Sequence, residues 1–309
     1  MNNLPDAIHI GFSKCGSTFL QAFFRQHPEI YLTHKLHFFS PFPFSNYDKG
    51  IEYYSSFFPN SAGKVKIDSD EHIILPIYHP KLGSAATTKE SVIEVCNKIN
   101  ETVPSIKIIL VIRNHKSLLL SRYSEYLLGG GKSKFKVFVD ENLSCSLDHK
   151  NYFQNYYADI ITTLYQFFGK SNVLVLLQEE LQKNGDKTIE SLCSFLNIKI
   201  YYPAVKKIRE KRIGLSLKGM KLMRLLNIML VIKPELFITK TRTRSPYWIY
   251  KSALRLVRLF DYYLPNSMKG KRNKLLTPDL VNQINTTFEK DNKELASLLG
   301  KNINQLGYN

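Results

Sequence analysis

The sequence predicts an α/β protein with a doubly wound parallel sheet that is flanked by helices and followed by a basic helical C-terminal section. Residues 106–112 (IKIILVI) form an uninterrupted apolar run rich in β-branched residues, which is typical of a parallel strand covered on both faces. Residues 7–12 are a second short buried strand, and a glycine-containing loop leads from it into helical spacing of apolar residues at 18–26. Strand, loop and helix in this order form the front half of a βαβ unit, and ligands of such sheets bind where the strands end.

The other predicted elements keep the alternation of strands and helices as far as Pro203. Further strands are expected at 65–67 and 173–177, and helices at 118–128, 152–168 and 188–196. Beyond Pro203 the pattern changes, and helices are expected at 215–230, 250–260 and 279–299. We therefore expect one domain over 1–309, composed of an α/β core at 1–205, a basic helical section at 206–274 and a closing helix at 275–309.

The positive charge of the chain is concentrated in the basic helical section. The formal net charge is +17. Residues 206–274 contain 19 Lys and Arg against three acidic residues, which gives 19 − 3 = +16. Such a field favours anionic partners, namely nucleotides, nucleic acid or an anionic membrane surface. The alternative is a solvated basic face that has no partner.

Cysteine usage and hydropathy indicate a cytoplasmic protein. The four cysteines are scattered without a paired spacing, which fits neither a zinc site nor a disulfide framework. Residues 1–6 lack the basic and apolar regions of a signal peptide. The longest apolar run, near 225–232, is too short to span a bilayer.

The loop after the first strand is a candidate phosphate site. Residues 11–18 (GFSKCGST) nearly fit the P-loop pattern GxxxxGK[ST], which makes the predicted fold P-loop-like. Ser17 occupies the usual lysine position, and the lysine lies inside the loop at Lys14. Gly16 allows the backbone to approach an anion, and the helix N-terminus adds partial positive charge. The alternative is an ordinary turn between a strand and a helix.

The end of the strand at 106–112 argues against a metal. P-loop nucleoside triphosphatases carry an aspartate at the corresponding place to help hold magnesium. Here the strand is followed by Arg113, which repels a metal ion and attracts phosphate. Ser121 lies eight residues later and can add a hydroxyl donor. We therefore expect an anionic nucleotide that is held by protein cations without a metal.

These residues resemble the sulfotransferases that use 3′-phosphoadenosine 5′-phosphosulfate (PAPS), particularly the bacterial and carbohydrate-modifying branch. The 5′-phosphosulfate loop of that family has the form PKxGTTxL, and residues 13–20 read SKCGSTFL. The family's 3′-phosphate motif is an arginine at a strand end and a serine eight residues later, which matches Arg113 and Ser121. Weaker similarity lies at 34–39 (HKLHFF, compared with KExHFF), 120–127, 189–198 and 288–295.

The resemblance implies roles for the donor-site residues. Lys14 would contact the oxygen that bridges phosphate and sulfonate, Gly16, Ser17 and Thr18 would bind the 5′-phosphate, and Arg113 and Ser121 the 3′-phosphate. Arg212 lies in a segment that resembles the family's nucleotide-closing loop; a plain basic loop is the alternative. The full set expected at the donor is Ser13, Lys14, Cys15, Gly16, Ser17, Thr18, Phe19, Arg113, Ser121 and Arg212.

The base that would deprotonate the acceptor is the point at which the sequence departs from the family. The glutamate of KExHFF is replaced by Lys35, which cannot act as a base while it is charged. Glu71 and His37 are near-equal candidates, followed by Asp70. The alternatives are a packed histidine and solvated loop carboxylates.

The basic helices suggest where the acceptor lies. Residues 215–230 and 247–260 combine Lys and Arg with aliphatic and aromatic residues, a pattern that suits an anionic membrane surface. We expect a glycan, lipid-linked glycan or lipopolysaccharide-type acceptor and a peripheral position at the inner face of the membrane. A groove for an anionic polysaccharide and plain core packing with snorkelling cations are the alternatives.

Two other functions compete with sulfonate transfer. A P-loop kinase would bind ATP with magnesium, but the lysine at position 17 and the strand-end aspartate are missing. A nucleic-acid-binding protein would explain the charge and the 12% aromatic content. No recognisable nucleic-acid module is present, so we expect nucleic acid not to be the partner.

Overall fold

The computed structural model describes residues 3–40, 45–58, 63–74, 89–144, 157–202, 214–233, 242–244 and 246–309. The chain divides into two compact units, each described here by itself. The sheet unit consists of Met1–Asn114, Asp148–Lys211 and Phe288–Asn309, and the helical unit of His115–Leu147 and Arg212–Thr287. Three separate stretches of the chain therefore build the sheet unit.

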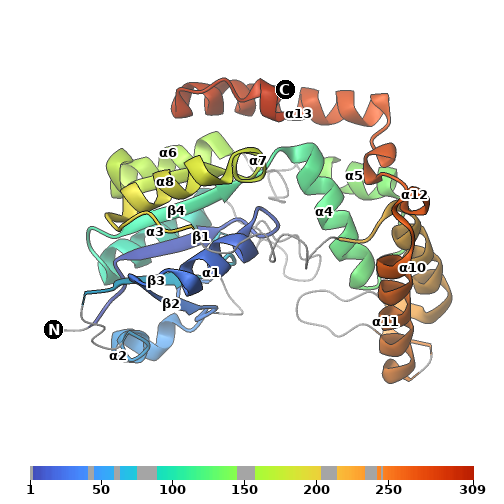
Figure 1. Ribbon diagram of the computed structural model, residues 1–309, viewed down its shortest axis with the longest axis horizontal. Helices are drawn as coiled ribbons and strands as arrows, with labels where there is room; N and C mark the ends of the chain where they lie inside the picture. The colour runs from blue at the N-terminus through green and yellow to red at the C-terminus, as the bar shows by residue number, and fades with distance from the viewer. Residues whose placement is uncertain are drawn as a thin grey trace. The chain divides into compact units, whose positions relative to one another are not determined.

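The sheet unit contains a five-stranded parallel sheet in the order β2-β3-β1-β4-β5 (Figure 1). Its strands are β1 (Ala7–Gly11), β2 (Ile30–His34), β3 (Val65–Ser69), β4 (Lys107–Ile112) and β5 (Val173–Leu177). All five residues of β1 are buried, as are five of the six residues of β4. The predicted parallel sheet and doubly wound α/β class are confirmed, and β1 and β4 are direct neighbours at its centre.

Helices cover both faces of the sheet because the connections between its strands run toward both edges. The helices of this unit are α1 (Ser17–Gln26), α2 (Gly50–Ser55), α3 (Lys89–Thr102), α6 (Tyr157–Phe168), α7 (Gln178–Lys183) and α8 (Gly185–Leu196). The crossover from β1 to β2 runs toward one edge of the sheet, and the crossover from β4 to β5 runs toward the other. Right-handed crossovers in opposite directions place their helices on opposite faces.

The last stretch of the chain belongs to the sheet unit. Asp291, in α13 (Pro278–Leu299), accepts hydrogen bonds from the backbone nitrogens of Tyr157 and Ala158, at 3.1 and 3.0 Å. These two nitrogens are the unpaired donors at the start of α6, so Asp291 caps that helix from a distant part of the sequence. Tyr308 is also buried, at 1% exposure.

The helical unit is built around two helices that pack against each other, α10 (Leu217–Leu230) and α11 (Tyr247–Tyr263). Its other elements are α4 (His115–Leu128), α5 (Phe135–Ser144), the hairpin of β6 (Val231–Lys233) and β7 (Arg242–Thr243), α12 (Asn266–Lys269) and the first part of α13. Buried Asn227 donates to the carbonyls of Leu127 and Gly131 and accepts from the hydroxyl of Tyr250. One amide therefore joins α10, α11 and the end of α4.

Most of the predicted helices agree with the structure to within a few residues at each end. The stretches 151–156 and 203–213, where the prediction placed the start of one helix and the closing loop, lie outside the described residues. In the part of the chain that the structure describes, no helix is long and apolar enough to cross a membrane.

Candidate donor and acceptor sites

The predicted phosphate loop joins β1 to α1. Gly16 lies at the N-cap of α1 with a φ of 115°, in the left-handed region that favours glycine. The loop is closed by a hydrogen bond from the Cys15 nitrogen to the Phe12 carbonyl at 3.2 Å. The first turn of α1 contains Ser17 and Thr18 and no acidic residue. The N-terminus of α1 therefore keeps the positive end of its dipole, which suits an anion.

The residues of this loop differ in what their side chains can contribute. Cys15 is fully buried, so its side chain belongs to the core. Lys14 and Ser13 are half-buried, and Lys14 has a φ of 67°. A lysine at the crest of such a loop can reach a bound anion with its ammonium group.

Arg113 directly follows β4 and lies against the phosphate loop. Its Nη1 donates to the carbonyl oxygen of Lys14 at 3.0 Å. Its own carbonyl accepts from the hydroxyl of buried Tyr157 at 2.7 Å. The two strand ends that the sequence singled out are thus adjacent, and a guanidinium lies beside the loop that carries Lys14.

A buried hydrogen-bond cluster behind Arg113 was not predicted. Asn114 donates to Glu179 Oε1 from its backbone nitrogen at 3.1 Å and from its side chain at 2.7 Å. Tyr308 donates to Glu179 Oε2 at 3.1 Å, and the side chain of Asn114 also contacts the carbonyl of Leu306 at 3.2 Å. Burial raises the pKa of Glu179, against the hydrogen bonds that it accepts. No sequence motif predicts these contacts, which join residues 65 to 192 positions apart.

The structure does not test the roles of two predicted donor residues. Ser121 is half-buried on α4, in the helical unit. Arg212 lies outside the described residues. The predicted place of Ser121 inside the helix that follows Arg113 is confirmed, whereas the roles of both residues toward a nucleotide stay predictions.

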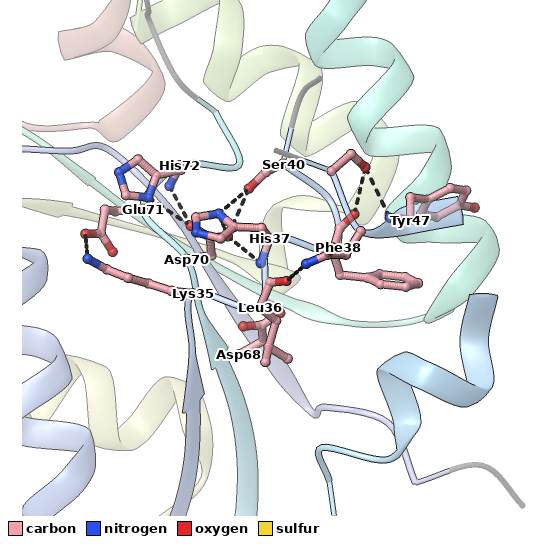
Figure 2. A network of polar contacts seen from close by, with 12 residues as sticks. Lys35, Leu36, His37, Phe38, Ser40, Tyr47, Asp68, Asp70, Glu71 and His72 are labelled. Carbon is pink, nitrogen blue, oxygen red and sulfur yellow. Dashed lines mark hydrogen bonds and ion pairs between the residues drawn. The ribbon is translucent and has the colours of Figure 1, made fainter. Parts of the chain in front are cut away.

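A second polar cluster lies where β2 and β3 end, and Asp70 is its centre (Figure 2). Asp70 is 1% exposed and accepts from the backbone nitrogen of His37 at 3.1 Å, the hydroxyl of Ser40 at 2.9 Å and the backbone nitrogen of His72 at 3.0 Å. Burial alone would raise the pKa of Asp70. Hydrogen bonds from His37 and His72 outweigh burial and hold the pKa well below its usual range, so the carboxylate is charged.

Both imidazole rings of the cluster approach the same carboxylate. The Nδ1 atoms of His37 and His72 lie 3.1 and 3.2 Å from Asp70 oxygens. Because a carboxylate only accepts, each Nδ1 carries the proton in that contact, and the basic nitrogen of a neutral ring is Nε2. The hydrogen bond to Asp70 raises the pKa of His37, partly opposed by burial. The prediction did not include His72, although its spacing of two from Asp70 was a signal.

Glu71 is held by two neighbours on the same edge. Gln21 of α1 donates to Glu71 Oε2 at 3.0 Å. The ammonium of Lys35 lies 3.7 Å from Glu71 Oε1 (Figure 2). Lys35 occupies the position at which the sequence departs from the KExHFF pattern. The ion pair of Lys35 and Glu71 therefore places a carboxylate, just after the end of β3, beside the lysine that replaces the family's glutamate.

Two more ionisable groups lie buried beneath this edge. His9 contacts the hydroxyl of Ser69 at 2.9 Å, and burial lowers the pKa of His9 to about 4. Tyr54 donates to Asp68 at 2.9 Å, and burial raises the pKa of Asp68 to about 7. His9 therefore favours its neutral form, and the charge of Asp68 changes with pH near neutrality, whereas Asp70 stays charged.

His37, Asp70 and His72 are also the residues of this edge that could hold a metal ion. One donor atom from each lies within 4.8 Å of the others. Hydrogen bonds between these atoms account for their spacing without an ion. The expectation that the protein works without a metal stays a prediction.

Comparison with known proteins identifies the family. Residues 4–245 match the sulfotransferase domain family. A sulfotransferase structure from Alicyclobacillus acidocaldarius aligns over 98% of this chain and 98% of its own, with a TM-score of 0.56 and 16% identity, which shows a shared fold. The mouse sulfotransferase SULT7A1, complexed with PAP, aligns over 93% of this chain and 83% of its own, with a TM-score of 0.49 and 13% identity. No curated protein matches the sequence significantly.

The family match spans well over half of the sequence, and the chain therefore belongs to the sulfotransferase domain family. The protein is a PAPS-dependent sulfotransferase. The family membership favours sulfonate transfer over the kinase and nucleic-acid functions that the sequence left open.

Proposed function

We propose that this protein moves the sulfonate of PAPS to a hydroxyl group of a glycan or glycolipid, without a metal ion. The contact between Arg113 Nη1 and the Lys14 carbonyl, 3.0 Å long, carries the proposal. It places a cation beside the phosphate loop at the adjacent strand end. An adenosine that is phosphorylated at both its 3′ and 5′ positions has two anionic ends that need such a pair of sites.

The donor is held by charge and by backbone dipoles. The N-terminus of α1, with Gly16, Ser17 and Thr18, receives the 5′-phosphate. Arg113 and Ser121 receive the 3′-phosphate. Lys14 neutralises the charge that develops on the oxygen between phosphate and sulfonate as the bond to sulfur breaks. Ser13, Cys15 and Phe19 complete the loop through their backbone, and Arg212 would close over the nucleotide.

The acceptor is activated by His37. Asp70 orients the ring by accepting from Nδ1 and raises the pKa of His37, so that Nε2 takes the proton of the attacking hydroxyl. Glu71 is the competing base, because its carboxylate lies on the same edge and replaces the glutamate missing at Lys35. Asp70 itself is ranked last, since its oxygens already accept several hydrogen bonds.

The acceptor class is proposed from two features. Residues 37–39 (HFF) resemble the acceptor-side segment of glycan sulfotransferases. The basic helical section suits an anionic sugar polymer, a lipid-linked glycan or a lipopolysaccharide-type precursor. Cys96 and Cys193 are buried and form no disulfide, which fits a reducing cytoplasm and a place at the inner face of the membrane.

Transfer of label tests this function directly. The protein is incubated with PAPS labelled in its sulfonate and with separated cell-envelope fractions, namely lipid-linked glycans, lipopolysaccharide precursors, polysaccharide and protein. We expect label in a glycan or glycolipid fraction, formation of adenosine 3′,5′-bisphosphate, and no loss of rate with a chelator. The Lys14→Ala variant is the inactive control. Label found only in protein, or ATP consumed in place of PAPS, would contradict the proposal.

A further inference from the structure

The exposed apolar residues of the protein are concentrated on two helices. Eighteen large hydrophobic residues are exposed in the described part of the chain, and fourteen of them lie between Leu222 and Met268. Scattered apolar residues on a surface need no explanation, but a concentration of this size marks a binding surface. The same stretch belongs to the basic helical section, with its charge of +16.

Helix α11 has two apolar faces on different sides. Its inward face contains Tyr250 and Val257, which are 1% and 7% exposed. Its outward face contains Trp248, Leu256 and Tyr263, which are 68%, 65% and 76% exposed. Spacings of eight and seven residues return close to the same side of an α-helix. A helix at the surface of a soluble protein carries polar residues on that side.

Helix α10 extends this outward surface. Leu222, Leu225 and Met229 are exposed and are spaced three and four residues apart, so they share one side of the helix. Helix α10 packs against α11 within the helical unit, as the ribbon also shows (Figure 1). We call the exposed apolar residues of α10 and α11 the outer apolar face.

Polar contacts on the inner side hold both helices in this orientation. The N-terminus of α10 is capped by Ser216, whose backbone nitrogen and hydroxyl both donate to buried Asp261 of α11. Farther along, the Tyr250 hydroxyl donates to Asn227 at 3.0 Å. Rotation of either helix to bury its outer side would break these buried bonds. The outer apolar face is therefore a fixed feature of the native fold.

Cations flank the outer apolar face. Lys251, Arg255 and Arg258 are exposed and follow one side of α11, next to the line of Trp248, Leu256 and Tyr263. Lys218 and Lys221 are exposed on α10. A lipid surface offers both partners that this arrangement needs, acyl chains for the apolar residues and anionic headgroups for the cations. Tryptophan and tyrosine also favour the boundary between headgroups and acyl chains.

We infer that the outer apolar face of α10 and α11 docks the protein onto a membrane surface rich in anionic phospholipids. A second copy of the chain is the weaker occupant, because it would bring two strongly positive sections together. The inference deepens the proposed function by placing a lipid-linked acceptor near the enzyme, and it rests on that function only for the identity of the acceptor.

Sedimentation with vesicles tests the docking. The full chain is mixed with vesicles of phosphatidylcholine alone or with about one third phosphatidylglycerol, at low and moderate salt, where the Debye length is about 30 Å and 8 Å. We expect pelleting with the anionic vesicles and severalfold less at moderate salt. The Trp248→Ser, Leu256→Ser, Tyr263→Ser triple variant should lose at least tenfold in vesicle affinity.

A matched triple variant controls for the loss of exposed apolar surface as such. Ile51, Val137 and Ile200 are 38%, 44% and 57% exposed and belong to neither α10 nor α11. Their replacement by serine should leave pelleting unchanged. Equal losses in both triple variants, no pelleting of the unaltered chain, or dimers in analytical ultracentrifugation that the α11 variant alone abolishes would each overturn the inference.

The vesicle assay is independent of catalysis. Binding is read without PAPS, so a protein that pellets but transfers no label would contradict the proposed function and leave the docking intact. A protein that transfers label to a soluble acceptor but never pellets would contradict the docking and leave sulfonate transfer intact. Replacement of Lys251, Arg255 and Arg258 by glutamine should reduce pelleting at low salt and weaken its salt dependence.

Discussion

Asp70 shows how one buried residue organises a reactive edge. It is charged because two histidines and two backbone nitrogens donate to it, and it then fixes the ring of His37. Burial keeps nearby His9 neutral and raises the pKa of Asp68 to about 7, so Asp70 is the more fully charged of the two aspartates. The negative charge at this edge is thus concentrated where a proton must be taken from an acceptor hydroxyl.

The pH–rate profile should report the contact between His37 and Asp70. The base is active when its ring is neutral, so the rate rises as pH increases through the pKa of His37, which Asp70 raises. In Asp70→Asn that pKa falls, and the acid limb of kcat/KM should move to lower pH, with a lower kcat because the ring loses its orientation. Measurement of kcat/KM across the pH range checks this.

Glu71→Gln distinguishes the two base candidates. If His37 is the base, Glu71→Gln retains most of the activity, and its profile of kcat/KM against pH keeps an acid limb. The base would instead be Glu71 if Glu71→Gln lost nearly all activity and the acid limb of kcat/KM in Asp70→Asn stayed at the same pH.

The two donor-site cations should affect different kinetic constants. Lys14→Ala should lower kcat by about 10²- to 10³-fold, as loss of a group that stabilises the transition state does, with a milder effect on donor binding. Arg113→Ala should weaken donor binding by roughly 10- to 100-fold, since hydrogen bonds to charged groups contribute about 1.5–3 kcal/mol. It should also reduce the preference for PAPS over adenosine 5′-phosphosulfate. Equal losses of kcat and donor affinity in Lys14→Ala would contradict its assignment.

At the scale of elements, the sequence was most informative about the centre of the sheet. An uninterrupted apolar run predicted β4, a short run that is mostly apolar predicted β1, and the glycine spacing predicted the loop after β1. Strand β2 (Ile30–His34) was missed, because at the edge of the sheet only two of its five residues are buried and its sequence lacks a long apolar run. The cluster of Asn114, Glu179 and Tyr308 could not be predicted, since it joins three distant stretches that carry no common motif.

Tyr308→Phe should disturb the donor site through Glu179 and Asn114. It removes the hydrogen bond to buried Glu179, which lowers the free energy of unfolding by about 1 kcal/mol. Because Glu179 also holds Asn114, next to Arg113, we expect KM for PAPS to rise severalfold while kcat changes little. Tyr202→Phe is the matched control, since it removes a similar bond to Glu190 at an exposed position. Equal KM for the two variants would limit Tyr308 to a purely structural role.

On the scale of the whole molecule, the phosphate loop and the outer apolar face belong to different units. Binding of adenosine 3′,5′-bisphosphate should slow hydrogen exchange in β1, in β4 and at 303–309, because a ligand that binds only the native state stabilises the unit that holds it. Helix α11 should be unaffected by the nucleotide and should gain protection when anionic vesicles are added. Protection of α11 by the nucleotide alone would contradict this separation.

The three-part construction of the sheet unit has a consequence for biosynthesis. The central strands β1 and β4 leave the ribosome early, but Asp291 and Tyr308, which cap α6 and hold the end of β4, emerge after the whole helical unit. All five strands have emerged by Leu177, but the sheet unit stays incomplete, and open to aggregation, until Asp291 and Tyr308 follow roughly 110 and 130 residues later. Chaperone dependence during expression should accordingly end only when the last helix has been released.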